Sequence, residues 1–481
     1  MVLYSPGHGF EGITGVRHRQ DKADEIPGTN VNKKGKILVF LGAISVVALY
    51  VSAIWFPTFL LIVLVSILLI WAYMTPRGAF LLLFPCIVPF TNLEIPGLPG
   101  ITLMRFFLIG VLIASLPRIK QYFPLFWNIP KYALVGIGWL LVAEVISGFF
   151  LSPASNAMIA VMVRITRTVT FLLAAAFASQ EGGLSKAMWG WIFFGVLQVF
   201  SATVLQLGYG SVMAARRMVG FELGSFDTVA AMAVAFGYMA VATFWFAVAK
   251  ALRKRGITKF ILWGFAVLSL AASFYSGRRQ ALLALVLSAL LAGVVMKGRR
   301  KLAMIGALCI VFIGLYYGGP LREFIENRQS LADELRLDSQ AQYMPMHIAG
   351  IKAFLESPIL GIGLGNYRAA TAAEGVIGTT GDWASSHSSV VRILTETGLL
   401  GAVGLAILSY GFALAMIRVI RSLRASPMIT TMHLVFPSIG LVLTGYAITL
   451  LDHFGYVFFF GQIVGLMSYY LKKTGKRVGS K

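Results

Sequence analysis

The sequence predicts an all-α polytopic membrane protein, and two observations indicate this class. The 481-residue chain is 58% hydrophobic and only 12% charged, with a mean hydropathy of +0.80, whereas soluble domains carry about 25% charged residues. The apolar residues also form long blocks, and about twenty such residues match the hydrocarbon thickness of a bilayer. We therefore interpret the chain as a membrane protein.

Apolar blocks follow one another along the whole chain, so we expect about 12–14 transmembrane helices. The third and fourth blocks are short, which is compatible with tilted, partly re-entrant or miscounted segments. The blocks cover residues 37–54, 57–74, 78–91, 102–117, 132–151, 157–179, 187–207, 227–249, 259–275, 280–296, 302–318, 390–417, 431–451 and 454–471.

Short basic clusters between the blocks predict the orientation. The net charge of +22 arises from 41 Lys and Arg against 19 Asp and Glu, and its clustering is typical of cytoplasmic loops, so no nucleic-acid partner is expected. With a cytoplasmic N-terminus, nearly every strong cluster falls on the inner side. These inner residues are Arg77, Arg118, Lys120, Lys131, Lys186, Lys250, Arg253, Lys254, Arg255, Lys259, Lys297, Arg299, Arg300, Lys301, Arg418, Arg421, Arg424, Lys472, Lys473, Lys476, Arg477 and Lys481.

This orientation divides the chain into five predicted parts, with both termini in the cytoplasm. Residues 1–36 have no apolar core, so they are interpreted as a cytoplasmic tail rather than a cleavable signal peptide. The other parts are transmembrane helices 1–11 in residues 37–318, a large outer-loop subdomain in 319–389, transmembrane helices 12–14 in 390–471, and a cytoplasmic tail in 472–481.

Four arginines fall on the outer side, against the charge bias. Arg216 and Arg217 lie between the seventh and eighth blocks, and Arg278 and Arg279 lie in the short turn between the ninth and tenth. Because positive charge is disfavoured there, its presence is a modest indication of function.

The outer loop 319–389 has a pattern of its own. Residues Gln340 to Glu356 predict a helix with Tyr343, His347, Ile351 and Phe354 on one face, and Pro358 ends it. The run Gly361-Ile362-Gly363-Leu364-Gly365 follows. We interpret it as a tight, closely packed turn, because no strand-turn-helix context supports a dinucleotide fingerprint.

Two charged residues lie inside the predicted hairpin of the fifth and sixth segments. Glu144 and Arg164 each lie about 10 Å from its outer turn at 1.5 Å of rise per residue, and charges at this depth need partners. We therefore predict a Glu144–Arg164 ion pair. Arg167, three residues further on, either neutralises a phosphate or bonds backbone carbonyls.

More charged residues lie around the start of the twelfth segment. Arg392 and Glu396 are four positions apart, which predicts a local ion pair on one helical face. His387 lies at the mouth of the segment, with Asp382 just before it. By itself, His387 is most simply interpreted as a capping or interfacial histidine.

Four short pieces, all on the predicted outer face, carry a family likeness. They are Arg217-Met218-Val219-Gly220-Phe221, Ser276-Gly277-Arg278-Arg279, the run from Pro358 to Tyr367, and His387-Ser388 followed after nine residues by Gly398-Leu399-Leu400-Gly401. In this order they resemble the O-antigen ligases and the O-antigen and exopolysaccharide polymerases of bacterial surface-polysaccharide assembly. The likeness spans about residues 210–410.

The resemblance implies a GT-C-like membrane glycosyltransferase of the bacterial inner membrane, with a periplasmic active site. Its donor would be an oligosaccharide on undecaprenyl pyrophosphate, and its acceptor a glycan or lipid A core. Other polysaccharide-assembly proteins are conceivable partners, besides the bilayer itself. The twelve helices usual in the ligases are fewer than the fourteen blocks counted here.

The resemblance also assigns roles to residues. Arg217 and Arg278 would stabilise the pyrophosphate leaving group, with Arg216, Arg279, Arg167 and Arg392 as further substrate contacts. His387 would accept the proton of the acceptor hydroxyl, with Asp382 as the alternative base or a glycan contact. The outer loops contain no clear paired-carboxylate motif, so we predict no cofactor, no metal site, and a metal-independent, inverting transfer.

Three functions remain open at this point. A polymerase that joins lipid-linked repeat units is slightly favoured by the extra segments and the tail. A ligase that moves the finished glycan to lipid A core has the closer signature. A polysaccharide or lipid transporter would predict inverted repeats and broken helices, and no convincing repeat is found between the halves.

Overall fold

The computed structural model describes residues 76–87, 94–95, 98–152, 154–209, 239–252, 254–275, 306, 309, 313, 316–317, 322, 339–376, 388–423 and 454–478. Within this part of the chain, 4 helical stretches are long and apolar enough to cross a membrane. They are Met104–Phe126, Lys131–Leu151, Met158–Ala178 and Ser389–Arg421. The all-α membrane class predicted from the sequence is confirmed.

Helices make up nearly all of the described structure, and one antiparallel hairpin, β1 (Glu94–Ile95) with β2 (Leu98–Thr102), pairs Glu94 with Thr102. The helices are α4 (Pro76–Ile87), α5 (Leu103–Ser115), the 3-10 turn η2 (Leu116–Arg118), α6 (Ile119–Phe126), α7 (Lys131–Leu151), α8 (Ala154–Ala178), α9 (Gly183–Tyr209), α12 (Met239–Ala251), α13 (Ile257–Tyr275), α17 (Ser339–Glu356), α18 (Tyr367–Ala373), α19 (Ser389–Leu423) and α21 (Phe454–Val478).

The predicted helix boundaries agree with the structure at α7 and α13, but the fourth segment was predicted too short. The helical path continues beyond residue 117 through η2 into α6 and ends at Phe126. Pro117 does not stop it, because proline is tolerated in the first turn of a helical element. Arg118 and Lys120 therefore lie on helical turns, although the sequence placed them in a loop.

Several other predicted segments lie wholly or partly outside the described residues. The blocks 37–54, 57–74, 280–296 and 431–451 are among them, and 302–318 is described at isolated positions only. The eighth block is described from Met239 onward.

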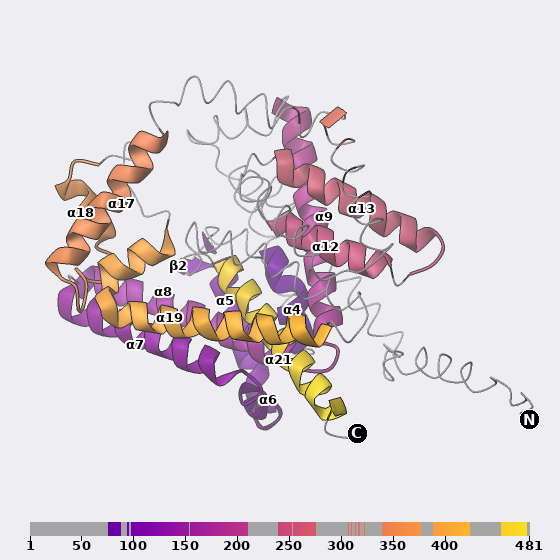
Figure 1. Cartoon of the computed structure of the whole chain (residues 1–481), viewed down its shortest axis with the longest axis horizontal. Coiled ribbons are helices and arrows are strands. Elements are labelled where there is room, and N and C mark those ends of the chain that lie inside the picture. Colours follow the sequence, from indigo (N-terminus) through magenta and orange to yellow (C-terminus); the bar gives the residue numbers. More distant parts are fainter. Residues whose placement is uncertain are drawn as a thin grey trace, which may run out of the picture.

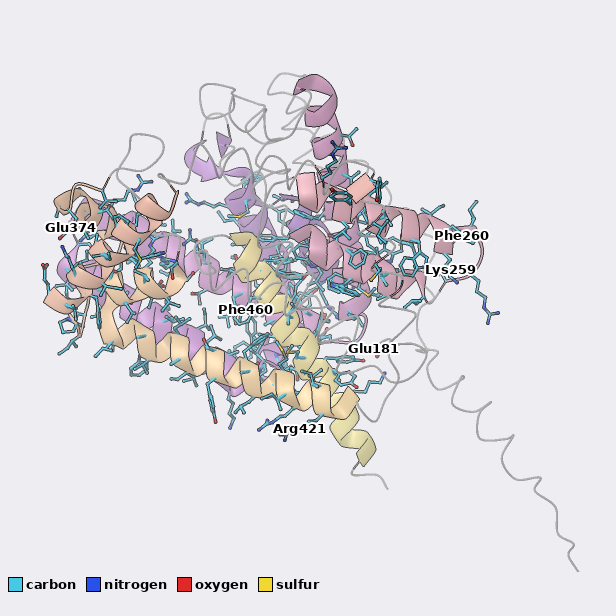
Figure 2. The ribbon with its side chains drawn as sticks, turned by 45° about the horizontal axis from the view of Figure 1, so that its top comes forward. Glu181, Lys259, Phe260, Glu374, Arg421 and Phe460 are labelled. Atoms are coloured by element: carbon cyan, nitrogen blue, oxygen red, sulfur yellow. The ribbon has the colours of Figure 1, made fainter. Side chains whose placement is uncertain are left out.

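Two long helix pairs organise the described core, as Figure 1 shows: α19 lies along α7, and α21 crosses beside them and packs on α8. Aromatic side chains fill the junction. Phe460 of α21 lies near the middle of the molecule (Figure 2), with ring centroids 5.6 Å from Phe171 and 5.0 Å from Phe412. One α21 side chain thus joins α8 and α19.

Small residues bring α21 unusually close to α8. A Cβ added at Gly465 would collide with the carbonyl of Ala175, and one added at Gly461 would lie 2.5 Å from the carbonyl oxygen of Phe171. Two glycines four positions apart on one face allow membrane helices to approach closely and gain van der Waals contact.

Replacement of Gly465 by leucine is therefore expected to destabilise the protein by at least about 2 kcal/mol, because the backbone of α8 cannot give way to the new side chain. Thermal unfolding of the purified protein in detergent measures the effect. Gly138→Leu on α7 is the matched control, since nothing lies within 4 Å of a Cβ there. Equal melting temperatures for the two variants would contradict the close packing.

Two of the residues predicted to face the cytoplasm, Arg77 and Lys472, make hydrogen bonds to turns between other helices. The Arg77 Nη2 donates to the Glu181 carbonyl over 2.8 Å, which ties the start of α4 to the α8–α9 turn. The Lys472 Nζ donates to the Asn128 Oδ1 over 2.7 Å, which joins α21 to the α6–α7 turn. Each bond thus joins two elements that the sequence places on the same side of the membrane.

Candidate functional site

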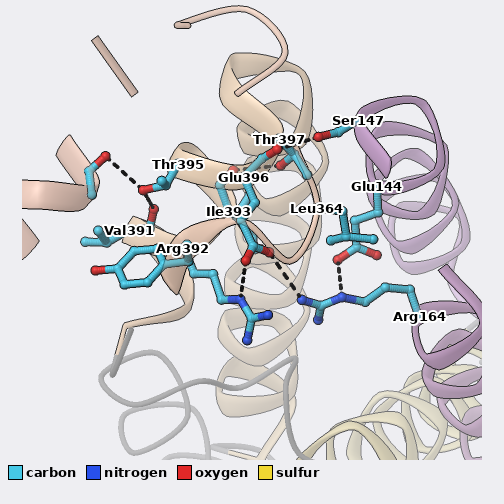
Figure 3. Close-up of polar contacts among 12 residues, drawn as sticks. Glu144, Ser147, Arg164, Leu364, Val391, Arg392, Ile393, Thr395, Glu396 and Thr397 are labelled. Atoms are coloured by element: carbon cyan, nitrogen blue, oxygen red, sulfur yellow. Dashed lines mark hydrogen bonds and ion pairs between the residues drawn. The ribbon is translucent and has the colours of Figure 1, made fainter. Parts of the chain in front are cut away.

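A buried network of four charged side chains lies at the opposite end of α7, α8 and α19 (Figure 3). The Arg164 Nε lies 3.1 Å from the Glu144 Oε1, and its Nη2 lies 3.8 Å from the Glu396 Oε2. From the other side, the Arg392 Nε lies 3.0 Å from the Glu396 Oε1. Glu396 is 1% exposed, so the carboxylate that both arginines contact is buried.

The network confirms both predicted ion pairs and joins them. Glu144–Arg164 is the pair expected within the α7–α8 hairpin, and Arg392–Glu396 is the pair expected along α19. Two carboxylates facing two guanidiniums have no formal net charge, which is the condition under which buried charges persist. The contact between Arg164 and Glu396 fastens α19 to the hairpin.

Helix α19 is broken at Gly398, next to this network. Its backbone there has φ 62° and ψ −155°, a conformation essentially restricted to glycine. Residues 389–397 and 399–423 are consequently two helical pieces joined by a kink. A break inside an apolar helix leaves backbone carbonyl and N–H groups that must find other partners.

The glycine-rich run after Pro358 supplies those partners through backbone hydrogen bonds. The amides of Ile362 and Gly363 donate to the carbonyls of Thr395 and Glu396, over 2.9 and 3.2 Å. In return, the Leu399 amide donates to the carbonyl of Pro358 over 2.8 Å, and the Leu400 amide donates to that of Ile359 over 3.1 Å. We call this arrangement, residues 358–363 bonded to residues 395–400, the clasp.

The clasp has room only for glycine at two of its positions. Gly361 has φ 71°, and a Cβ there would strike the backbone between Glu396 and Thr397. A Cβ on Gly398 would collide with the Ile359 carbonyl. The run is therefore a tight, closely packed turn, as the sequence predicted, and its tightness serves the joint with α19.

Side chains of α7 complete the joint. The Ser147 hydroxyl donates to the Glu396 carbonyl, the Trp139 Nε1 donates to the Leu400 carbonyl over 2.8 Å, and the Ser152 hydroxyl donates to the Leu364 carbonyl over 2.8 Å. A broken helix is also what a transporter would have. Here the groups released by the break are bonded to the protein itself, so the break has a structural role.

Helix α17 packs on the first piece of α19. The Thr395 hydroxyl lies 2.9 Å from the Gly350 carbonyl, and the Tyr367 hydroxyl donates to the Met346 carbonyl over 2.7 Å. The helix has the predicted extent, but its buried stripe is Met346, Ala349 and Ala353. Of the face singled out from the sequence, Ile351 is 47% exposed.

Ser388 caps α19. Its hydroxyl accepts the Val391 amide at 3.4 Å, and its carbonyl accepts the Arg392 amide at 3.0 Å. Small hydroxyl residues are preferred at this position because they satisfy an amide that the helix leaves unpaired.

Comparison with known families assigns this region. Residues 264–406 match the family model described as O-antigen ligase. The chain carries an O-antigen ligase domain. The match supports the resemblance to the O-antigen ligase and polymerase superfamily, and three of the four short pieces lie within it. No curated protein matches the chain by sequence.

The O-antigen ligase domain includes the whole clasp, α17, α18 and the acidic member of the network on α19. Glu144 and Arg164 lie before it in the chain, so the preceding hairpin supplies the other two members of the network. The domain indicates a glycosyltransferase-like enzyme of surface-polysaccharide assembly, acting in a membrane on a lipid-linked glycan and an acceptor.

The site residues predicted from the sequence divide into two groups. Arg392 and Arg167 are described: Arg392 takes part in the network, and Arg167 lies half-buried three residues beyond Arg164 on α8. The others lie outside the described residues, namely His387, Asp382, Arg216, Arg217, Arg278 and Arg279.

The sequence did not identify three features of the O-antigen ligase domain's surroundings: the contact between Arg164 and Glu396, the clasp, and the role of Ser147. The sequence signal for the clasp was a pair of glycine motifs, residues 361–365 and 398–401. Each motif contains a glycine with a positive φ, Gly361 in the first and Gly398 in the second. In the described part of the chain, no group of three or more His, Cys, Asp or Glu could hold a metal ion.

Proposed function

We propose that the protein transfers a glycan from an undecaprenyl-pyrophosphate donor to a sugar hydroxyl at the periplasmic face of the bacterial inner membrane. The reaction polymerises lipid-linked repeat units of an exopolysaccharide or O-antigen. The O-antigen ligase domain supports the reaction class.

The clasp is the observation that carries the proposal. It holds residues 389–397 rigidly between the outer loop and α7, and His387 and Ser388 immediately precede this piece. A general base must lie within hydrogen-bond reach of the proton it accepts, so its support has to be rigid. A buried charge network, a helix cap and four backbone hydrogen bonds hold residues 389–397, the helical piece that follows His387 in the sequence.

In the proposed reaction His387 accepts the proton of the acceptor hydroxyl while its oxygen attacks the anomeric carbon of the donor glycan. The new glycosidic bond forms as the bond from that carbon to the pyrophosphate oxygen breaks. Undecaprenyl pyrophosphate leaves with the bonding electron pair, and direct displacement inverts the anomeric configuration. Asp382 is the alternative base.

Arginines on the outer side would stabilise the leaving group. Arg217 and Arg278 are the principal candidates, and Arg216, Arg279 and Arg167 are the further ones. A guanidinium is permanently charged and grips phosphate oxygens with two parallel hydrogen bonds. Fixed positive charge aimed at the developing pyrophosphate lowers the barrier without a divalent metal, so we propose a metal-independent transfer.

Ligation to lipid A core is the second candidate, and the family description itself favours it. The two functions share the donor and the leaving group and differ in the acceptor. Arg392 suits either acceptor as a glycan contact, because its side chain is 27% exposed beside the buried Glu396.

In vitro transfer by the purified protein, with a lipid-pyrophosphate oligosaccharide and EDTA present, tests the proposal. Products separated by size should form a ladder from this substrate alone. Product that appears only after lipid A core is added would replace the polymerase with the ligase. Dependence on added divalent metal would remove the metal-independent mechanism, and movement of uncleaved substrate across the bilayer would favour the transporter.

Replacement of His387 by alanine, or of Arg278 by glutamine, is expected to lower the transfer rate by about 10²–10⁴-fold, because each removes a group acting on the transition state. Lys259→Gln, at an exposed position in the first turn of α13, is the control with the same loss of charge as Arg278→Gln. The melting temperature of each variant shows whether the fold is retained. Wild-type transfer by folded His387→Ala protein would remove the base from the mechanism.

A further inference from the structure

A cavity of about 650 Å³ lies between α7, α19 and α21, at the end of these helices away from the clasp. Lys131 and Tyr132 from the first turn of α7 line it, together with Arg418 from the last turns of α19. Glu144 of the charge network is thirteen positions beyond Lys131, which is about 20 Å along a helix. The cavity is therefore separate from the proposed reaction site.

The inner walls of the cavity are apolar. Ile407 and Leu414 of α19 face it from one side, and Met467 and Leu471 of α21 from another. Helices α7 and α19 are both apolar and long enough to span a membrane. A cavity with such walls, opening between membrane-crossing helices, suits hydrocarbon chains better than a water-soluble ligand.

Three cationic side chains line the same cavity. Lys131, Arg418 and Lys472 are all exposed, and the lining residues include no Asp or Glu within the described part of the chain. The Lys472 Nζ donates to the neutral Asn128 Oδ1 over 2.7 Å, so this hydrogen bond leaves its charge uncompensated. The lining thus carries three positive charges that an anion can neutralise.

The Tyr132 hydroxyl adds an unmet hydrogen-bonding group. It is buried and has no hydrogen-bond partner within the described part of the chain. Its ring lies against Gly411, where any side chain would displace it. A buried hydroxyl without a partner is costly, and a phosphate or ester oxygen entering the cavity would satisfy it.

We infer that this cavity binds an anionic phospholipid of the surrounding bilayer. Its phosphate would lie among Lys131, Arg418 and Lys472, and its acyl chains along Leu414 and Met467. Basic pockets between membrane helices recognise acidic headgroups in this way. The inference concerns a site remote from the clasp, and it stands whether or not the protein transfers glycans.

The test is native mass spectrometry of the purified full-length protein in neutral detergent, titrated with phosphatidylglycerol, phosphatidylcholine or inorganic phosphate. One phosphatidylglycerol should bind in preference to phosphatidylcholine. The triple variant Lys131→Gln, Arg418→Gln, Lys472→Gln should weaken that binding about 100-fold, since each basic residue near an acidic headgroup contributes about fivefold. Lys254→Gln, Arg255→Gln, Lys259→Gln, at another exposed basic turn, is the control with equal loss of charge.

A second variant tests the apolar part. Leu414→Trp fills the cavity without changing its charge and should also release the lipid. Equal loss of binding in both triple variants would overturn the site in favour of diffuse charge attraction. Equal binding of phosphatidylcholine, full competition by inorganic phosphate, or a protein dimer that forms through this cavity would each overturn the assignment to an anionic phospholipid.

Discussion

Gly398→Ala is expected to abolish glycan transfer and to lower stability by about 3 kcal/mol or more. Two costs add. The backbone at φ 62° and ψ −155° is strained for any residue with a side chain. The new Cβ also collides with the carbonyl of Ile359. This carbonyl cannot move away without breaking the hydrogen bond that it accepts from the Leu400 amide. The clasp would open, and the helical piece that follows the proposed base would lose its hydrogen bonds to residues 358–363.

Thermal unfolding and the transfer rate per folded molecule measure the two consequences. Gly375→Ala is the matched control: Gly375 also has a positive φ, 66°, but nothing lies within 4 Å of an added Cβ. The control therefore carries backbone strain without the collision. A Gly398→Ala protein that melts and turns over like Gly375→Ala would show that the clasp is dispensable.

Arg164→Met should destabilise the protein by about 3–5 kcal/mol, the cost of leaving a buried charge without its partner. Glu144 would lose the guanidinium 3.1 Å from its carboxylate, and Glu396 would keep only Arg392. The first piece of α19 would also lose its charged link to the α7–α8 hairpin, so transfer should fall further than stability alone explains.

Rescue distinguishes this explanation from a general loss of packing. Glu144→Gln added to Arg164→Met removes one uncompensated charge and should recover part of the stability. Lys120→Met is the control, because Lys120 is an exposed cation on the apolar helix α6. Should Arg164→Met unfold at the same temperature as Lys120→Met, the charge network would not contribute to the stability of the protein.

Local patterns in the sequence were enough to predict the class of the protein and several of its contacts. Hydropathy predicted the extents of α7 and α13, because a membrane helix is apolar over its whole length. Arg392–Glu396 followed from helical spacing. Glu144–Arg164 followed from equal distances to a hairpin turn, since antiparallel helices place such positions side by side.

The tertiary structure alone joined these pieces. Ser147 and Glu396 are 249 positions apart, and no period in the sequence relates them. From the sequence, Glu396 was predicted to pair with Arg392 on its own helix. In the structure it also contacts Arg164, which lies on α8. The glycine run was predicted as a turn. Its hydrogen bonds to the broken helix around Gly398 could not be predicted, because the two segments meet only in the folded structure.

The sequence by itself thus determined that the chain crosses a membrane, where most described helices run, and which charges pair with near neighbours. These properties depend on apolar surface and helical spacing, which are encoded within a few turns. Only the tertiary structure decided that residues 358–363 bond to a broken helix and that Lys131, Arg418 and Lys472 share one cavity. Such contacts arise from the packing of distant segments, whose mutual register is set by shape and buried hydrogen bonds rather than by any local pattern.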